Sequence, residues 1–164
     1  MKQCRWLLMA AMLVCVQYAV GAQTLLTTRT ISLDAAQELA TAALAECRKS
    51  GYKVTVTVLD NRGGTKLVMH DDGANPHTIE NSMRKAYTSL TFRVPSGDYG
   101  KRVTTNPQLV GMLHLDRITT LEGALPIMAG KEIVGSVGVS GAPGGEKDAV
   151  CAQAGISKIA SGLN

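Results

Sequence analysis

Residues 53–60 read KVTVTVLD, and this stretch with its continuation decides the fold. Valine and threonine alternate in it, which is typical of a strand with one buried face. The turn NRGG follows at 61–64, and residues 65–70 (TKLVMH) resume a strand-like pattern. A short glycine-rich turn between two such runs predicts a β-hairpin.

A helix is expected on each side of this hairpin. Upstream, apolar residues recur every three or four positions over 36–47, with Ser32 placed to cap the start and Gly51 to end the helix. Downstream, a second helix is expected over 77–91. Its buried stripe is predicted to consist of apolar residues, namely Ile79, Met83, Ala86 and Leu90.

The C-terminal half predicts further strands and a last helix. Residues 98–113 are expected to form one or two short helices, and 117–121 a strand. Residues 123–129 and 132–140 suggest a second hairpin, and 146–160 a helix. Residues 23–31 are either a lead-in strand or a loose arm. This order predicts an α+β fold, with an antiparallel sheet of about five strands flanked by helices.

The first 22 residues have the features of a secretion signal. A basic opening precedes an apolar run at 6–20, which is too short to span a bilayer comfortably. Small residues then offer a cleavage site before Gln23, so residues 23–164 are expected to form one mature, periplasmic or secreted domain. The alternative, an uncleaved membrane anchor, is disfavoured by the length of the run.

The mature chain is nearly neutral. The sequence has 164 residues, of which 17 are Lys or Arg and 13 are Asp or Glu. Lys2 and Arg5 are the only charged residues before Gln23, so 15 basic and 13 acidic side chains remain. This balance gives no reason to expect a nucleic-acid partner. The composition, 45% hydrophobic and 18% charged, excludes a disulfide-scaffold miniprotein, a disordered chain and a multi-span membrane protein.

The start of the second predicted helix carries a candidate site. His77, Asn81, Arg84 and Thr88 fall on roughly one helix face, opposite the expected apolar stripe. A neutral imidazole is a good ligand for iron, copper or zinc. A guanidinium nearby suits a carboxylate or phosphate of the same ligand. The same pattern is also compatible with a solvated helix start that merely exposes a histidine.

Two other histidines and two cysteines leave alternatives open. His70 or His114 is available as a second metal ligand, whereas no spacing favours a structural zinc site or covalent c-type haem. Cys47 and Cys151 lie on predicted helices. They either form one disulfide, as two cysteines in an exported chain suggest, or are two small buried residues.

The glycine-rich stretch at 138–145 (GVSGAPGG) is neither a phosphate loop nor a nucleophile elbow, because both motifs lack required residues here. A flexible connection between strand and helix is the better interpretation. Such a loop is still able to cover a ligand.

Several motifs, in order along the chain, resemble the GlcG/HbpS family of haem-binding proteins. They are VLDNRGG at 58–64, RKAYTS at 84–89, LEGALPI at 121–127, IVGSVGVSG at 133–141 and DAVCAQAG at 148–155. The resemblance covers about residues 31–160. It implies a profilin-like fold with a five-stranded antiparallel sheet, and homo-oligomers in which dimers build larger rings. It also implies, for some members, bound haem.

On this resemblance the chain is an exported b-type haem-binding protein, used in haem handling or redox sensing. His77 would coordinate the iron, and His114 is the candidate second ligand. This His114 would come either from the same chain or from a neighbouring subunit. The family's basic pair falls on Arg84 and Lys85, which would pair with the propionates. Three further side chains are expected to line the pocket: Met83, Tyr87 and Met112.

Two alternatives belong to other functional classes. In one, the protein is a haem-free small-molecule binder or accessory enzyme. Its pocket would hold an organic acid or a corrinoid, and Arg84 would bind a carboxylate of that ligand. In the other it is an oligomeric assembly protein without a ligand. No catalytic triad order, carboxylate pair or nucleotide motif argues for an enzyme.

Overall fold

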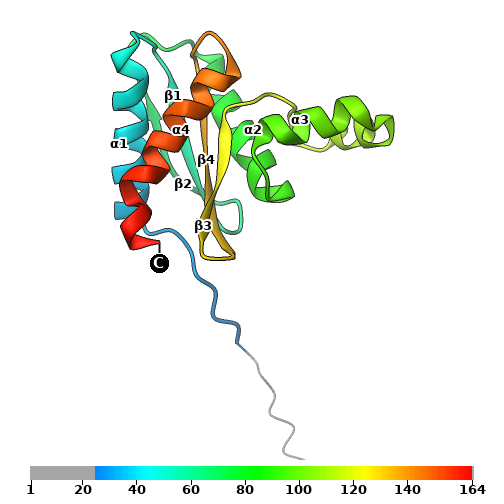
Figure 1. Ribbon diagram of the computed structural model, residues 1–164, viewed down its shortest axis with the longest axis horizontal. Coiled ribbons are helices and arrows are strands. Elements are labelled where there is room, and N and C mark those ends of the chain that lie inside the picture. The colour runs from blue at the N-terminus through cyan, green and yellow to red at the C-terminus, as the bar shows by residue number, and fades with distance from the viewer. Residues whose placement is uncertain (1–24, 164) are drawn as a thin grey trace, which may run out of the picture.

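A four-stranded antiparallel sheet forms the centre of the computed structural model, which describes residues 25–163 (Figure 1). The strands are β1 (Thr55–Asp60), β2 (Thr65–His70), β3 (Ala124–Ala129) and β4 (Glu132–Ser140). Their order across the sheet is β2-β1-β4-β3, so two hairpins meet at the central β1–β4 pair. The predicted signal, residues 1–22, lies outside the described residues.

The prediction of five strands was wrong, because the segment 117–121 does not form one. Its polar backbone groups bond to a helix instead. The Thr119 amide donates to Thr88 Oγ1 at 2.9 Å, and the Ile118 carbonyl accepts from Arg84 at 3.1 Å. A backbone satisfied by helix side chains does not require a neighbouring strand. The lead-in segment adds a hydrogen bond of 2.9 Å from the Ile31 amide to the Val134 carbonyl, without becoming a strand.

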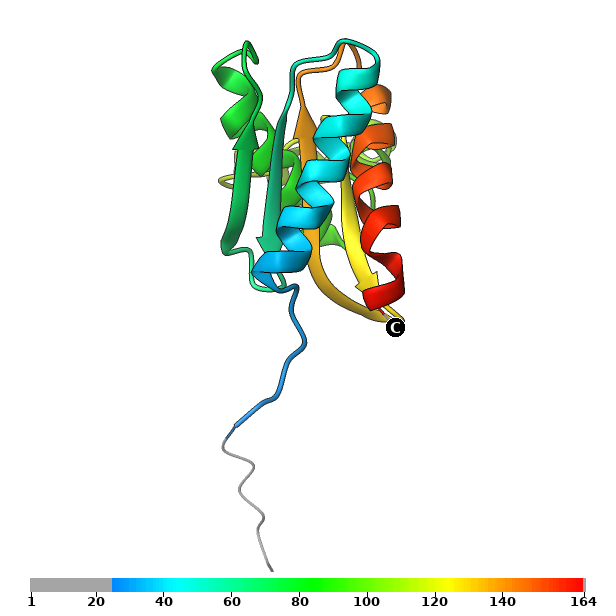
Figure 2. The ribbon, with the colours of Figure 1, turned by 90° about the vertical axis from the view of Figure 1, so that its left-hand side faces the viewer.

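Helices α1 (Leu33–Lys49) and α4 (Gly145–Ile159) lie side by side over one face of the sheet (Figure 2). The Ser32 hydroxyl accepts from the Ala35 amide at 3.2 Å, which confirms the predicted cap. A disulfide between Cys47 and Cys151 joins the two helices and decides between the two interpretations of these residues. The apolar core lies between this layer and the sheet. It contains two fully buried valines of β1, Val56 and Val58, and a third just before the strand, Val54.

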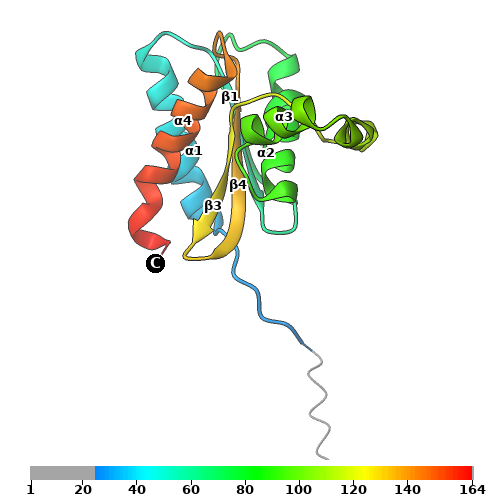
Figure 3. The same cartoon turned by 45° about the vertical axis from the view of Figure 1, so that its right-hand side comes forward.

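Helix α2 (His77–Phe92) covers the opposite face, as Figure 3 shows. Helix α2 contacts β1 through hydrogen bonds between side-chain hydroxyl groups. Thr55 Oγ1 lies 2.7 Å from Thr78 Oγ1, and Thr57 Oγ1 lies 2.7 Å from Ser82 Oγ. The same strand therefore presents valines to one helical layer and threonines to the other.

The predicted buried stripe of α2 is only half right. Ala86 and Leu90 are buried, whereas Ile79 is 42% exposed and Met83 is half-buried. The helix is rotated because the sheet beneath it offers threonines and glycine. A Cβ on Gly138 would lie 2.1 Å from the Ser82 carbonyl oxygen, so the helix backbone approaches the strand too closely for large side chains.

The chain between α2 and β3 forms an arm that extends away from the sheet (Figures 1 and 3). It contains α3 (Ser96–Thr105) and the 3-10 helix η1 (Pro107–His114), which confirms the expected short helices. The arm has a small apolar cluster of its own around Tyr99. A last 3-10 turn, η2 (Ala160–Gly162), ends the described chain. Within the described residues, no helix is long and apolar enough to cross a membrane.

Candidate ligand-binding site at the start of helix α2

The polar face predicted on α2 exists but is largely covered. The segment that was expected to be a strand runs along it, bonding to Arg84 and Thr88 as described above. The face stays open at its N-terminal end, where His77 is exposed and Asn81 is half-buried.

A cavity of about 390 Å³ lies at this open end, between the start of α2, the end of the covering segment and the loop from β4 to α4. These segments meet at the upper end of the sheet in Figure 3. The glycine-rich loop lines part of it through Gly141, Ala142 and Gly145. The lining residues are Asn75, His77, Asn81, Lys85, Leu121, Glu122, Ser140, Gly141, Ala142, Gly145 and Asp148.

A buried ion pair forms one wall of this cavity. Lys85 Nζ lies 2.8 Å from Asp148 Oδ2 and donates to the Val139 carbonyl at 3.0 Å, and both charged side chains are less than 5% exposed. The other carboxylate oxygen accepts from the Ala142 amide at 3.0 Å. Burial raises the pKa of Asp148, and the neighbouring ammonium opposes that shift. Gly123 is required here, since a Cβ on it would lie 2.8 Å from Nζ.

The three histidines differ in how they are held. His70 Nδ1 lies 2.7 Å from Thr55 Oγ1, so its ring is fixed at the end of β2. Among the described residues, no hydrogen bond holds the rings of His77 and His114, and both side chains are exposed. No group of three or more His, Cys, Asp or Glu side chains suited to a metal occurs in the part of the chain that the structure describes.

The other predicted site residues lie outside the cavity. Arg84 is partly exposed and lies 3.6 Å from Glu80. The Tyr87 ring lies 5.5 Å from the Arg117 guanidinium, and Met83 is half-buried on the same helix. Residues Met112 and His114 belong to η1 in the arm, which contributes nothing to the cavity wall within the described residues. One chain thus brings together His77 and Lys85, but not the remaining predicted residues.

The sequence prediction missed Asp148 and Ser140. A signal for Asp148 was present: it falls in register with Cys151, Ala152 and Gly155 on the buried stripe of α4. A carboxylate in register with a buried stripe requires a partner, because unpaired charges are almost never fully buried. Ser140 had no such signal, since it ends a strand in which all residues from Val134 onward are buried.

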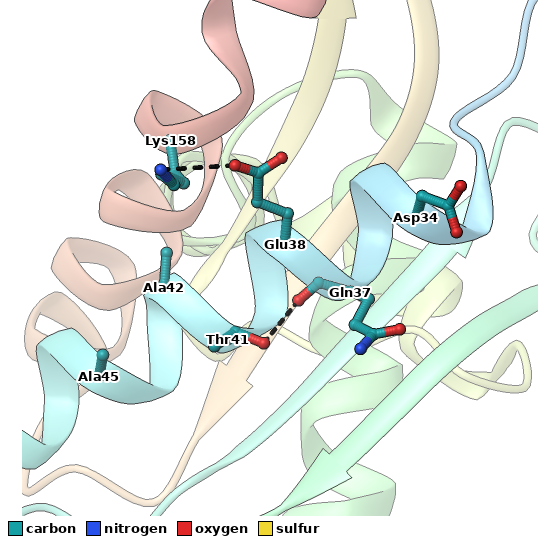
Figure 4. Close-up of a pocket in the computed structure, with 7 residues that line it drawn as sticks. All are labelled: Asp34, Gln37, Glu38, Thr41, Ala42, Ala45 and Lys158. Carbon is teal, nitrogen blue, oxygen red and sulfur yellow. Dashed lines mark hydrogen bonds and ion pairs between the residues drawn. The ribbon is translucent and has the colours of Figure 1, made fainter.

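A second hollow lies on the outer surface of α1 and α4 and differs from the cavity in character (Figure 4). It has a volume of about 470 Å³ and a floor of small residues, Ala42 and Ala45. Its ion pair, between Glu38 and Lys158 at 3.4 Å, is more than half exposed. No buried polar group converges on it, so the cavity beside His77 is the candidate site.

Comparison with known proteins places most of the described chain in one family. The family model described as "Haem degrading protein HbpS-like" matches residues 31–157. An uncharacterized 15.0 kDa protein from the dhaT-dhaS intergenic region of Citrobacter freundii is 32% identical over 114 residues, covering 68% of this chain and 80% of that protein. Protein GlcG of Escherichia coli K12 is 30% identical over 108 residues, covering 63% and 79%.

Solved structures show the same fold. The crystal structure of a double mutant of Streptomyces reticuli HbpS has a TM-score of 0.76 at 32% identity, covering 81% of this chain and 89% of that one. The crystal structure of a PduOC–haem complex has a TM-score of 0.71 at 21% identity, covering 79% and 95%. At 21% identity, the similarity to PduOC shows a shared fold only.

Proposed function

Because the chain belongs to the HbpS-like family, we propose that it binds haem b, with the site at the start of α2. The observation that carries the proposal is the position of His77. Its imidazole is exposed, free of hydrogen bonds among the described residues, and located at the mouth of the cavity. A neutral imidazole of this kind is a common axial ligand of haem iron. PduOC, which shares the fold, has been crystallised with haem.

The cavity offers little of the apolar surface that a haem requires. Leu121, which is 51% exposed, provides an apolar contact beside His77, whereas most of the other lining groups are polar. A flat apolar macrocycle requires contacts on both of its faces. We therefore propose a homo-oligomeric site, in which a second copy covers the other face. The arm supports this proposal, because Val110 of η1 and Leu115 directly after it are exposed, close in sequence to Met112 and to His114, the predicted second ligand.

The basic residues divide between two roles. We assign the haem propionates to Arg84, because the Lys85 side chain is only 4% exposed and lies too deep for a ligand as large as haem. The Arg84 side chain is 39% exposed, and its Nε is buried without a partner among the described residues. A guanidinium with unused donors suits a carboxylate. Bound haem would supply an iron centre for ligand binding or electron transfer, which agrees with the proposed roles in haem handling or redox sensing.

Titration of haemin into the purified mature protein tests the haem proposal. We expect a red-shifted Soret band that saturates, and its loss in His77→Gly with recovery on addition of free imidazole. His70→Ala is the matched control, because that ring is bonded to Thr55, and its spectrum should equal the wild type. The absence of a Soret shift in the wild type, or an unchanged spectrum in His77→Gly, would refute the assignment. Loss of the six-coordinate spectrum in His114→Ala would identify the second ligand.

Export to the periplasm or beyond is part of the same proposal. The Cys47–Cys151 disulfide supports it, since disulfides persist in oxidising compartments. Mass spectrometry of the periplasmic fraction should find a protein that begins at Gln23 and is two hydrogens lighter than its reduced form. A full-length, reduced protein in the cytoplasm would contradict it.

A further inference from the structure

The cavity beside His77 contains two buried hydrogen-bond donors that the protein does not use. An ammonium group carries three N–H donors. Those of Lys85 are directed to Asp148 and to the Val139 carbonyl, so one remains, and the residue is 3% exposed. Ser140 is 2% exposed, and its hydroxyl oxygen accepts from Asn81 Nδ2 at 2.9 Å. Among the described residues its own hydroxyl proton has no acceptor. Both residues line the same cavity.

Buried donors without acceptors are costly, so they indicate what the cavity holds. Here both unused groups are donors, and one of them is charged. The start of α4 adds a third favourable element, since Gly145 lines the cavity and the amino end of a helix favours negative charge. The Asp148 carboxylate is balanced by the Lys85 ammonium at 2.8 Å, so the pair itself is neutral. The other acidic side chain of the lining, Glu122, is exposed, so water screens its charge. The preference for an anion therefore comes from the free N–H, the hydroxyl and the helix start.

We propose that this cavity binds a small monocarboxylate ion, held by Lys85 Nζ and the Ser140 hydroxyl, independently of haem. The volume of about 390 Å³ suits a short carbon chain, and Leu121 at the rim provides its apolar contact. The ion pair with Asp148 fixes the ammonium in place before the ligand arrives, so little conformational entropy is lost on binding.

Thermal unfolding of the haem-free protein in the presence of acetate, propionate or butyrate tests the proposal. The expected result is an increase of the melting temperature that saturates with ligand concentration. Acetamide and sodium chloride at the same concentrations should give no such increase. A similar increase with acetamide would overturn the assignment, because the site would then not recognise charge. No increase with any of the three carboxylates would also overturn it.

A pair of serine variants on one strand locates the site. Ser140→Ala removes the hydroxyl donor, and a lost hydrogen bond to a charged ligand should weaken carboxylate affinity about tenfold or more. Ser136→Ala is the matched control: this serine is also buried on β4, its hydroxyl lacks a partner in the described chain, and it does not line the cavity. Equal affinities in the two variants would place the carboxylate elsewhere and refute the proposal.

A test of the charged donor, Lys85, requires a double variant, because Lys85→Met alone would leave the buried Asp148 carboxylate without a counter-ion. Lys85→Met with Asp148→Leu removes both charges and should abolish the carboxylate effect. A double variant that still folds and still binds would refute the role of Lys85. If the double variant does not fold, the comparison of Ser140→Ala with Ser136→Ala still tests where the carboxylate binds.

A carboxylate in this cavity also has a second possible source, a haem propionate. Haemin titration of the serine variants separates the two. A normal Soret titration in Ser140→Ala together with weakened acetate binding supports a free small ligand. The reverse result, no acetate effect in the wild type but weaker haemin binding in Ser140→Ala, assigns the cavity to a propionate and overturns this proposal. A failure of haemin to bind at all would refute the haem proposal and leave the acetate result standing.

Discussion

The two faces of the sheet are built from the same strands but in different ways. On the side of α1 and α4, the valines of β1 pack against alanine-rich helices that a disulfide joins. On the side of α2, Thr55 and Thr57 of the same strand pair their hydroxyls with the helix. Lys85 of α2 pairs with Asp148 in the first turn of α4, so this ion pair joins the two helical layers. Apolar burial is non-directional, whereas buried hydrogen bonds require fixed partners. The α1–α4 face therefore serves stability, and the α2 face positions specific groups around a cavity.

The largest expected effect comes from breaking the buried ion pair between α2 and the first turn of α4. Lys85→Met leaves the Asp148 carboxylate buried without its counter-ion, which typically costs about 3–5 kcal/mol. Unfolding in urea, followed by circular dichroism, measures the loss. The double variant Lys85→Met with Asp148→Leu should recover most of it, because replacing both partners by apolar groups is often neutral.

An exposed ion pair is the control for that experiment. Lys101 lies 3.2 Å from Asp98, and both side chains are more than half exposed. Lys101→Met should change the free energy of unfolding by less than about 1 kcal/mol. Equal losses of stability in the Lys85 and Lys101 variants would show that burial does not strengthen the contribution of the Lys85–Asp148 ion pair.

The next effect belongs to the opposite face. Replacing Cys47 and Cys151 by alanine removes a link between residues 104 positions apart, and should lower stability by about 2–4 kcal/mol. Affinity for haemin or acetate should be unchanged at temperatures where the variant stays folded, because neither cysteine lines the cavity and the ion pair with Lys85 still holds the first turn of α4. A fall in affinity with the fold intact would show that the two faces are coupled.

Sequence patterns predicted those features that depend on neighbouring residues. The hairpin at 55–70, the capping serine before α1 and the bounds of β4 follow from alternation, capping preference and turn composition. Each depends on residues only a few positions apart. The family resemblance covered the same segments and agrees with the family match.

Features set by distant residues were mispredicted or missed. Ile79 is exposed although its spacing suggested burial, because the rotation of α2 is decided by threonines and a glycine on strands far away in the chain. Residues 117–121 are not a strand, because their partners are the Arg84 and Thr88 side chains. Asp148 acquires its role from Lys85, 63 residues earlier. Such pairings are not visible in a local pattern.

A smaller effect is expected from the hydroxyl pairs of the α2 face. Ser82→Ala removes the partner of the buried Thr57 hydroxyl, and leaving such a group unsatisfied costs about 1–3 kcal/mol. Adding Thr57→Val should restore much of the stability, since both polar groups are then gone. Thr41→Ala, which removes an exposed hydroxyl from α1, should have almost no effect in the same urea experiment. A double variant less stable than Ser82→Ala would contradict the pairing.

The smallest effect expected is a difference in acid sensitivity between two buried carboxyls. Asp71 accepts two hydrogen bonds from Arg48, at 2.6 and 3.0 Å, and this guanidinium lowers the pKa of Asp71 below its ordinary value of 3.8. The native state therefore binds this proton less readily than the unfolded chain. The resulting stability is present above pH 3.8 and is lost as the pH falls through the lowered pKa. The effect is small because the Arg48 side chain is 54% exposed and screened by water.

The contribution of Asp148 to stability changes with pH in the opposite direction. Burial raises its pKa, so its contribution to stability decreases as the pH rises from 3.8 through that raised pKa. Melting temperatures measured from about pH 2 to 7 separate the two groups. Asp71→Asn should flatten the loss of stability in acid, while Asp116→Asn, an exposed control in the loop after η1, should leave the curve unchanged. If Asp71→Asn follows the wild-type curve below pH 3.8, the Arg48 contact does not stabilise the ionised carboxyl, and the acid sensitivity of the fold must come from other groups.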